Sequence, residues 1–139
     1  MSERTNGSAP SRVRGDRGDT MLMTTVLISF LLVASWALIS ASQQWSARRD
    51  VQAAASAASR AAAQVTSEEI RGGVVVIDPT LAAERAATVL SASGYSGGVT
   101  DIDGLTVTVT ATGPVVYAFP SPGFPGSLTA EANSSAVRG

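Results

Sequence analysis

The sequence has no cysteine and no histidine, and all ten of its basic residues are arginine. Without cysteine, the chain can form neither a disulfide framework nor a thiolate metal site. Without histidine or lysine, no serine has the neighbouring base that nucleophilic catalysis needs. The sequence therefore predicts a protein that is not an enzyme and that holds no cofactor or metal.

Aromatic residues are also scarce, at 5%, although 45% of the residues are hydrophobic. The apolar residues are therefore mostly alanine and valine, which bury little surface each, so we expect a thin core. Ten basic and eleven acidic residues give a net charge of −1. This balance provides no basic surface for nucleic acid, which we do not expect as a partner.

A long uncharged segment lies near the N-terminus, between Asp19 and Arg48. Within it, Met21 to Ala41 forms a 21-residue apolar stretch, about 31 Å long as a helix, which matches the hydrocarbon core of a bilayer. Phe30 lies near its middle and Trp36 toward its end, where indole rings favour the membrane interface. We predict a transmembrane helix over residues 19–42.

The arginines that flank this segment predict its orientation. Four precede it and two follow it closely; they are Arg4, Arg12, Arg14 and Arg17, then Arg48 and Arg49. Because positive charge is enriched on the cytoplasmic side, we expect the N-terminus to be cytoplasmic. The chain would then be a single-pass protein of the cell membrane. Residues 1–18 would be a disordered cytoplasmic tail, and the C-terminal part would be extracytoplasmic.

A cleaved signal peptide is the competing interpretation of the same segment. Ser40-Ala41-Ser42 has the small residues that a signal peptidase needs before Gln43, and cleavage there would release a small secreted factor. The apolar stretch is longer than a usual signal-peptide core, and no helix breaker separates it from the helical sequence that follows. We therefore favour an uncleaved anchor.

The next segment, residues 43–72, is rich in alanine and predicts a continuing extracytoplasmic helix that ends at Gly72-Gly73. Ala54, Ala58 and Ala62 form a row of small residues on one helix face. Such rows let another backbone approach closely, so we predict a packing interface with a partner helix or sheet.

Residues 73–139 predict a small α+β head. Val74–Ile77 is typical of a short buried strand, and Asp78-Pro79 opens a helix that Gly94 ends. Asp103-Gly104 lies between two strand-like runs and indicates a β-hairpin, which explains Asp101 and Asp103 better than a calcium loop does. With an alternating last strand near residues 128–133, we expect one helix and an antiparallel sheet of about three or four strands.

The segment from Gly113 to Gly126 contains four prolines and three aromatic residues. We predict a loop whose aromatic side chains, Tyr117, Phe119 and Phe124, are exposed and form a contact surface.

The order of these segments resembles a known family. An Arg-Gly pair (Arg17-Gly18) leads through an apolar helix into QQWSARRDVQAAASAASRAAAQV. This tract is similar to the Q-x-x-A-D-A-A-A-x-A-G-A pattern of TadE/TadG-like proteins of the tight-adherence (Flp) pilus system, at Gln52, Ala53, Ala57, Ala58, Arg60, Ala61 and Ala63. The strands that follow look like those of the small actinobacterial members, and the resemblance covers about Arg17 to Val137.

The resemblance implies a pilin-like, membrane-anchored component of pilus assembly or of a related secretion system. Its partners would be other proteins of that system, or further copies of itself. Pseudopilins are cut after a glycine and carry glutamate at the fifth mature position, which makes Gly18 the candidate processing site. Met23 occupies that fifth position here and cannot pair with a neighbour's N-terminus as glutamate can. An anchored binder of a small molecule or polysaccharide is a further alternative.

Overall fold

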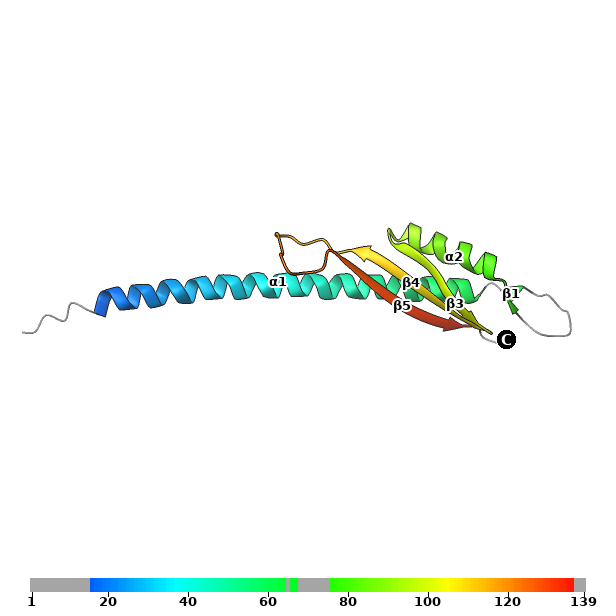
Figure 1. The fold of residues 1–139 in the computed structure, drawn as a ribbon, viewed down its shortest axis with the longest axis horizontal. Coiled ribbons are helices and arrows are strands. Elements are labelled where there is room, and N and C mark those ends of the chain that lie inside the picture. The colour runs from blue at the N-terminus through cyan, green and yellow to red at the C-terminus, as the bar shows by residue number, and fades with distance from the viewer. Residues whose placement is uncertain (1–15, 65, 68–75, 137–139) are drawn as a thin grey trace, which may run out of the picture. The chain divides into compact units, whose positions relative to one another are not determined.

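The computed structural model describes residues 16–64, 66–67 and 76–136 (Figure 1). They form an α+β structure, as predicted, in two compact units, residues 1–37 and 38–139. The elements are α1 (Asp16–Ala63), β1 (Thr66–Ser67), β2 (Val76–Ile77), α2 (Pro79–Ala92), β3 (Ser96–Asp103), β4 (Thr106–Pro114) and β5 (Ser127–Ser135).

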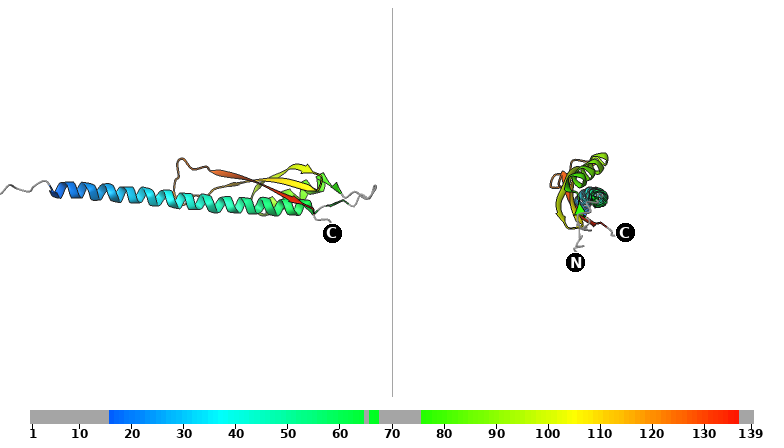
Figure 2. Two further views of the ribbon diagram at one scale, coloured as in Figure 1. Left: turned by 90° about the horizontal axis from the view of Figure 1, so that it is seen from below. Right: turned by 90° about the vertical axis from the view of Figure 1, so that its right-hand side faces the viewer.

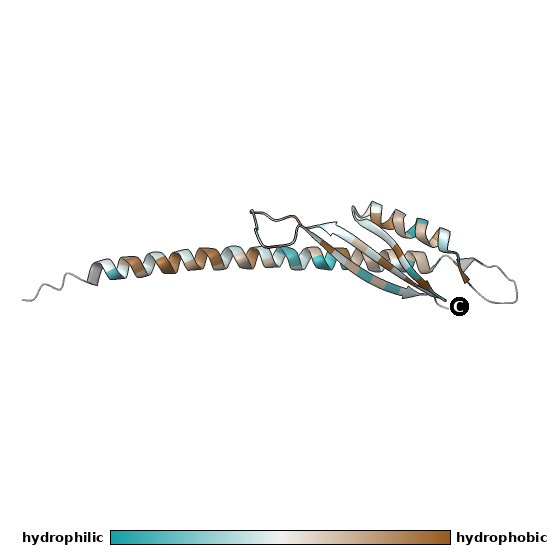
Figure 3. Cartoon of the chain, in the orientation of Figure 1, coloured by the Kyte–Doolittle hydropathy of each residue, from teal (hydrophilic) through white to brown (hydrophobic). Residues whose placement is uncertain are grey.

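The described part of the first unit is the N-terminal portion of α1, and its large apolar side chains are exposed. From Met21 to Val33 their exposed fractions lie between 53% and 78%, and Figure 3 shows the brown, apolar colouring of this portion. The hydroxyl groups of Thr24, Thr25 and Ser29 donate to carbonyl oxygens four residues earlier, so the helix satisfies them internally, as lipid requires. Among the described residues, this is the one helix long and apolar enough to cross a membrane.

The bounds of α1 differ from the prediction at both ends. Residues 16–18, expected in the tail, are helical, and α1 ends at Ala63 rather than at Gly72. After Gln64 the helix gives way to a short strand, in which Thr66 and Ser67 pair antiparallel with Ile77 and Val76. The β-branched Val65-Thr66 pair has a lower helix propensity than the alanines before it. Residues 68–75, with Gly72-Gly73 and the first half of the predicted strand, lie outside the described residues.

The main sheet has the antiparallel order β3-β4-β5. Side chains alternate along the central strand β4: Val107, Val109 and Ala111 are buried, as predicted. The other face carries hydroxyl pairs across neighbouring strands, namely Thr106 with Ser135, Thr112 with Thr129 and Thr110 with Thr100, at oxygen distances of 2.9, 2.9 and 3.2 Å. One face of the sheet is thus apolar and the other polar.

Both helices cover the apolar face of the sheet in the second unit (Figure 2). The buried core residues are mostly small, as the composition predicts: Val51, Ala54, Ala55, Ala58, Ala62, Ala63, Ile77, Ala82, Ala86, Leu90, Val107, Val109 and Ala111. Small side chains let the backbones approach closely, and the buried area per residue is correspondingly low.

The β3–β4 hairpin confirms the predicted turn with a shift of one residue. Asp103 pairs with Thr106, so Gly104 and Leu105 are the two loop residues. Gly104 has φ +58°, and no described residue other than glycine has a positive φ. This combination defines a type II′ turn, which needs glycine at the first loop position.

The start of α2 is fixed by the predicted cap. The carboxylate of Asp78 accepts hydrogen bonds from the backbone N–H groups of Thr80 and Leu81, at 2.9 and 3.2 Å. Proline occupies the first helical position, where its missing N–H has no cost. At the other end, Gly94 follows the cap with φ +76°, as the prediction for that glycine requires.

Removing this cap should lower the stability of the second unit. We expect Asp78→Ala to reduce the free energy of unfolding by about 1 kcal/mol, because two N–H groups lose their acceptor. Asp78→Asn keeps an acceptor oxygen and is the matched control, with a loss of a few tenths of that value at most. Thermal unfolding followed by circular dichroism measures both, and equal losses in the two variants would contradict the capping role.

Candidate functional site

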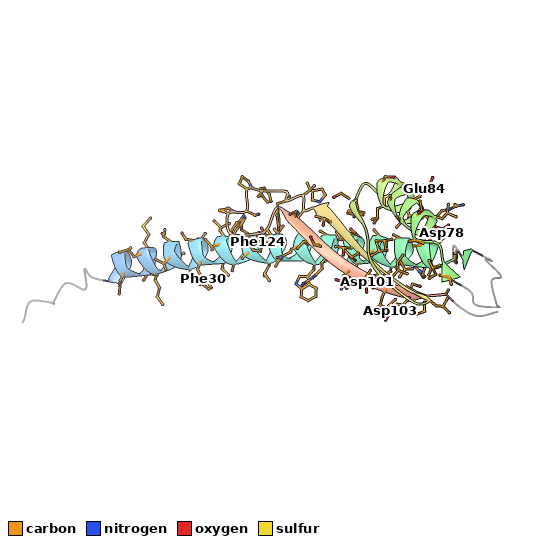
Figure 4. The ribbon with its side chains drawn as sticks, turned by 45° about the vertical axis from the view of Figure 1, so that its right-hand side comes forward. Phe30, Asp78, Glu84, Asp101, Asp103 and Phe124 are labelled. Atoms are coloured by element: carbon orange, nitrogen blue, oxygen red, sulfur yellow. The ribbon has the colours of Figure 1, made fainter. Side chains whose placement is uncertain are left out.

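The carboxylates of the described residues do not converge. Figure 4 shows Asp78 at the start of α2, Glu84 on α2, and Asp101 and Asp103 at the β3–β4 hairpin. Residues 16–64, 66–67 and 76–136 contain no group of three acidic, histidine or cysteine side chains arranged to hold a metal. The features with a specific geometry are surfaces: one face of α1, and the loop that joins β4 to β5.

The alanine row that was predicted as an interface lies inside the molecule. Ala58 and Ala62 are fully buried, and Ala54 is 6% exposed. They belong to the same core cluster as Val107 and Val109 of β4. Close packing of small residues is therefore present, but its partner is the sheet of the same chain. The row leaves no free surface for a second chain.

The β4–β5 loop, residues 115–126, is held against α1. Its ends are joined by a hydrogen bond from the Val115 N–H to the Gly126 carbonyl, at 2.9 Å. The Ala118 N–H donates to the side-chain oxygen of Gln43, at 3.2 Å, and the hydroxyl oxygens of Ser121 and Ser40 lie 2.9 Å apart. The loop thus contacts α1 at residues 40–43 (Figure 1).

The three aromatic residues of this loop have different roles, which corrects the prediction that all three are exposed. Tyr117 and Phe124 are half-buried and pack on each other, with ring centroids 5.9 Å apart. The Tyr117 hydroxyl also donates to the carbonyl of Pro125, at 2.9 Å. Phe119 is exposed, as predicted, at 56%. The first two stabilise the loop, and Phe119 is the aromatic contact that the loop presents.

Sequence reasoning missed Ser40, Gln43 and Gln52, which hold distant segments to α1. Gln52 donates from its side-chain nitrogen to the Glu131 carbonyl of the edge strand β5, at 3.1 Å. Ser40 is 2% exposed although it lies in the apolar segment. A signal existed in the polar residues at positions 40 and 43, which share one helix face, but the sequence does not indicate what they contact.

Two predicted residues lie in the first unit without a contact that assigns a role. Gly18 is exposed in the first turn of α1, and a side chain there would meet no atom within 4 Å. Met23, at the position where a processed pseudopilin carries glutamate, is 78% exposed. Processing at Gly18 stays a prediction.

An apolar N-terminal helix that continues as one wall of a small α+β core is a pilin-like arrangement. Residues 18–65 match the Tad family model, described as "Putative Flp pilus-assembly TadE/G-like". The predicted resemblance is thereby confirmed over residues 18–65, and the match does not extend over the rest of the expected range, Arg17 to Val137. The match does not address the actinobacterial type. No curated protein and no solved structure matches the chain.

Proposed function

We propose that this protein is a membrane-anchored structural component of a Tad/Flp-type pilus or of a related secretion system, acting through protein–protein contacts. The family match carries this proposal, because residues 18–65 include both the apolar segment and the alanine face of α1. A structural role requires an anchor and a folded head. The apolar segment of α1 supports the first, and the α+β second unit supports the other.

The anchor, in this proposal, stays uncleaved, with the N-terminus cytoplasmic and the second unit extracytoplasmic. The candidate signal-peptidase site, Ser40 to Gln43, lies within α1 and beneath the β4–β5 loop. Ser40 is buried, and the side chain of Gln43 accepts a hydrogen bond from the loop. In the folded second unit this candidate site is therefore helical and covered by the loop, which supports an uncleaved anchor.

The proposal is tested by deleting the gene from its host. We expect deletion to remove Flp-type filaments from the cell surface in electron micrographs, and expression of the full chain to restore them. Mass spectrometry of the protein from the membrane fraction should find a peptide that contains the segment Met21–Ala41. In spheroplasts, a cysteine in place of the exposed Leu81 should react with a membrane-impermeant maleimide.

Three outcomes would contradict separate parts of the proposal. Normal filaments after deletion would exclude the pilus role. A mature N-terminus at Gln43, in the medium rather than the membrane, would establish the secreted alternative. Reaction of the Leu81→Cys variant only after the membrane is permeabilised would show that the second unit lies on the cytoplasmic side.

A further inference from the structure

The β4–β5 loop combines exposed apolar side chains with a fixed position beside α1. Val116 is 81% exposed and Phe119 is 56% exposed. The sequence from Gly113 to Gly126 contains no charged residue. An exposed apolar segment of this kind in a folded domain marks a contact surface.

The position of the loop identifies what it contacts. Its two side-chain links to α1 are at Ser40 and Gln43, and Leu38 and Ile39, just before them, are exposed apolar residues of the same unit. Residues 40–43 lie at the C-terminal end of the apolar stretch, which runs from Met21 to Ala41. If that stretch spans a bilayer, these residues lie where hydrocarbon gives way to headgroups.

The residues of α1 that follow Gln43 are placed to lie at the outer, aqueous edge of the headgroup layer. Counting from Ala41 at 1.5 Å per residue, Trp45 lies about 6 Å and Arg48 about 10 Å beyond it. A headgroup layer is about 5–8 Å thick on each side of the bilayer. Trp45 is 64% exposed, as is typical of an interfacial tryptophan, and charge begins only at Arg48.

Some of the loop's polar groups are satisfied within the protein or absent, which lowers the cost of placing the loop in a poorly hydrated layer. Pro120, Pro122 and Pro125 have no N–H to satisfy. The N–H groups of Val115, Ala118 and Phe124 all donate within the protein, as do the hydroxyls of Tyr117 and Ser121. Irregular backbone does not enter the hydrocarbon core, but satisfied groups of this kind suit the interface.

We propose that the β4–β5 loop is a second membrane contact, which inserts Phe119 and Val116 into the lipid interface on the side of the second unit. The proposal rests on the membrane anchoring proposed above. With α1 alone, the second unit would be attached to the bilayer at one point. With the loop, it is attached at two, and this restricts how the sheet can tilt relative to the lipid surface.

The absence of cysteine makes this proposal directly measurable, because each introduced cysteine is the only one in the chain. Nitroxide labels are placed in four single variants of the full chain: Phe30→Cys, Leu81→Cys, Val116→Cys and Phe119→Cys. Each protein is reconstituted into vesicles of phosphatidylethanolamine and phosphatidylglycerol. Power-saturation electron paramagnetic resonance then compares collisions with oxygen, which concentrates in lipid, and with a water-soluble nickel chelate.

We expect the oxygen-to-nickel accessibility ratio at Val116 and Phe119 to be several-fold higher than at Leu81, and lower than at Phe30. Leu81 is the matched control, since it is an apolar residue of the same unit, 44% exposed on α2. Ratios at both loop positions equal to that at Leu81 would overturn the proposal and leave the loop free for a protein partner. A water-like ratio at Phe30 would instead show that the anchor itself fails, together with the proposed function.

Discussion

Replacing Gly97 by alanine is expected to lower the free energy of unfolding of the second unit by at least about 2 kcal/mol. Gly97 lies in β3 opposite Ala111 of β4, with φ +144°, a backbone conformation that other residues rarely adopt. A Cβ atom at this position would collide with the carbonyl oxygen of Thr110. That oxygen belongs to the backbone of the central strand, so the clash cannot be relieved by rotating a side chain, and the β3–β4 pairing has to shift.

The neighbouring glycine supplies the control. Gly98 has no positive φ, and a Cβ atom there would meet no atom within 4 Å. Gly98→Ala should therefore be neutral, or slightly stabilising because alanine restricts the unfolded chain. Thermal unfolding of both variants in a mild detergent is the measurement. For a domain of this size, each kcal/mol lowers Tm by about 4–8 °C. Equal Tm values for the two variants would mean that the backbone conformation at Gly97 does not constrain the sheet.

Features governed by neighbouring residues were predicted correctly from the sequence. The alternation of valine and threonine along β4 predicted which face is buried, since strand side chains alternate strictly. Asp78-Pro79 predicted the start of α2 because the capping hydrogen bonds join Asp78 to residues only two and three positions later. The apolar stretch from Met21 to Ala41 was equally recognisable from adjacent residues, and the helix exposes the large apolar side chains from Met21 to Val33, as a membrane span requires.

Features that depend on distant parts of the chain were not predictable in this way. After α1 ends at Ala63, Thr66 and Ser67 pair with β2, whose residues follow nine to eleven positions later. The links from Ser40 and Gln43 to the β4–β5 loop connect residues that are 81 and 75 positions apart. A sequence pattern can indicate that a helix face is adapted for close packing, but it does not identify what packs there.

The alanine row is the clearest case, and it changes the interpretation of α1. The row was predicted to contact a partner, whereas it forms one wall of the core of its own chain. The part of α1 from Leu38 to Ala63 is therefore an integral element of the second unit and not a separate stalk. A change on this face acts first on folding, and any effect on assembly with other proteins follows from that.

This interpretation predicts the result of enlarging the row. Ala58 is 0% exposed, so Ala58→Leu forces an isobutyl group into a filled core. We expect the free energy of unfolding to fall by about 1–3 kcal/mol, which corresponds to a loss in Tm of roughly 4–24 °C. The measurement is thermal unfolding of the purified chain in detergent, with no partner protein present.

The matched control is Ala53→Leu, at an exposed alanine of the same helix. Leucine and alanine have similar helix propensities, so this variant should unfold within about 0.5 kcal/mol of the original chain. If the row were instead an interface between chains, Ala58→Leu would leave the stability of the isolated protein unchanged and would weaken only its complexes. Because Ala58 packs with the valines of β4 in one chain, the loss should appear in the isolated protein.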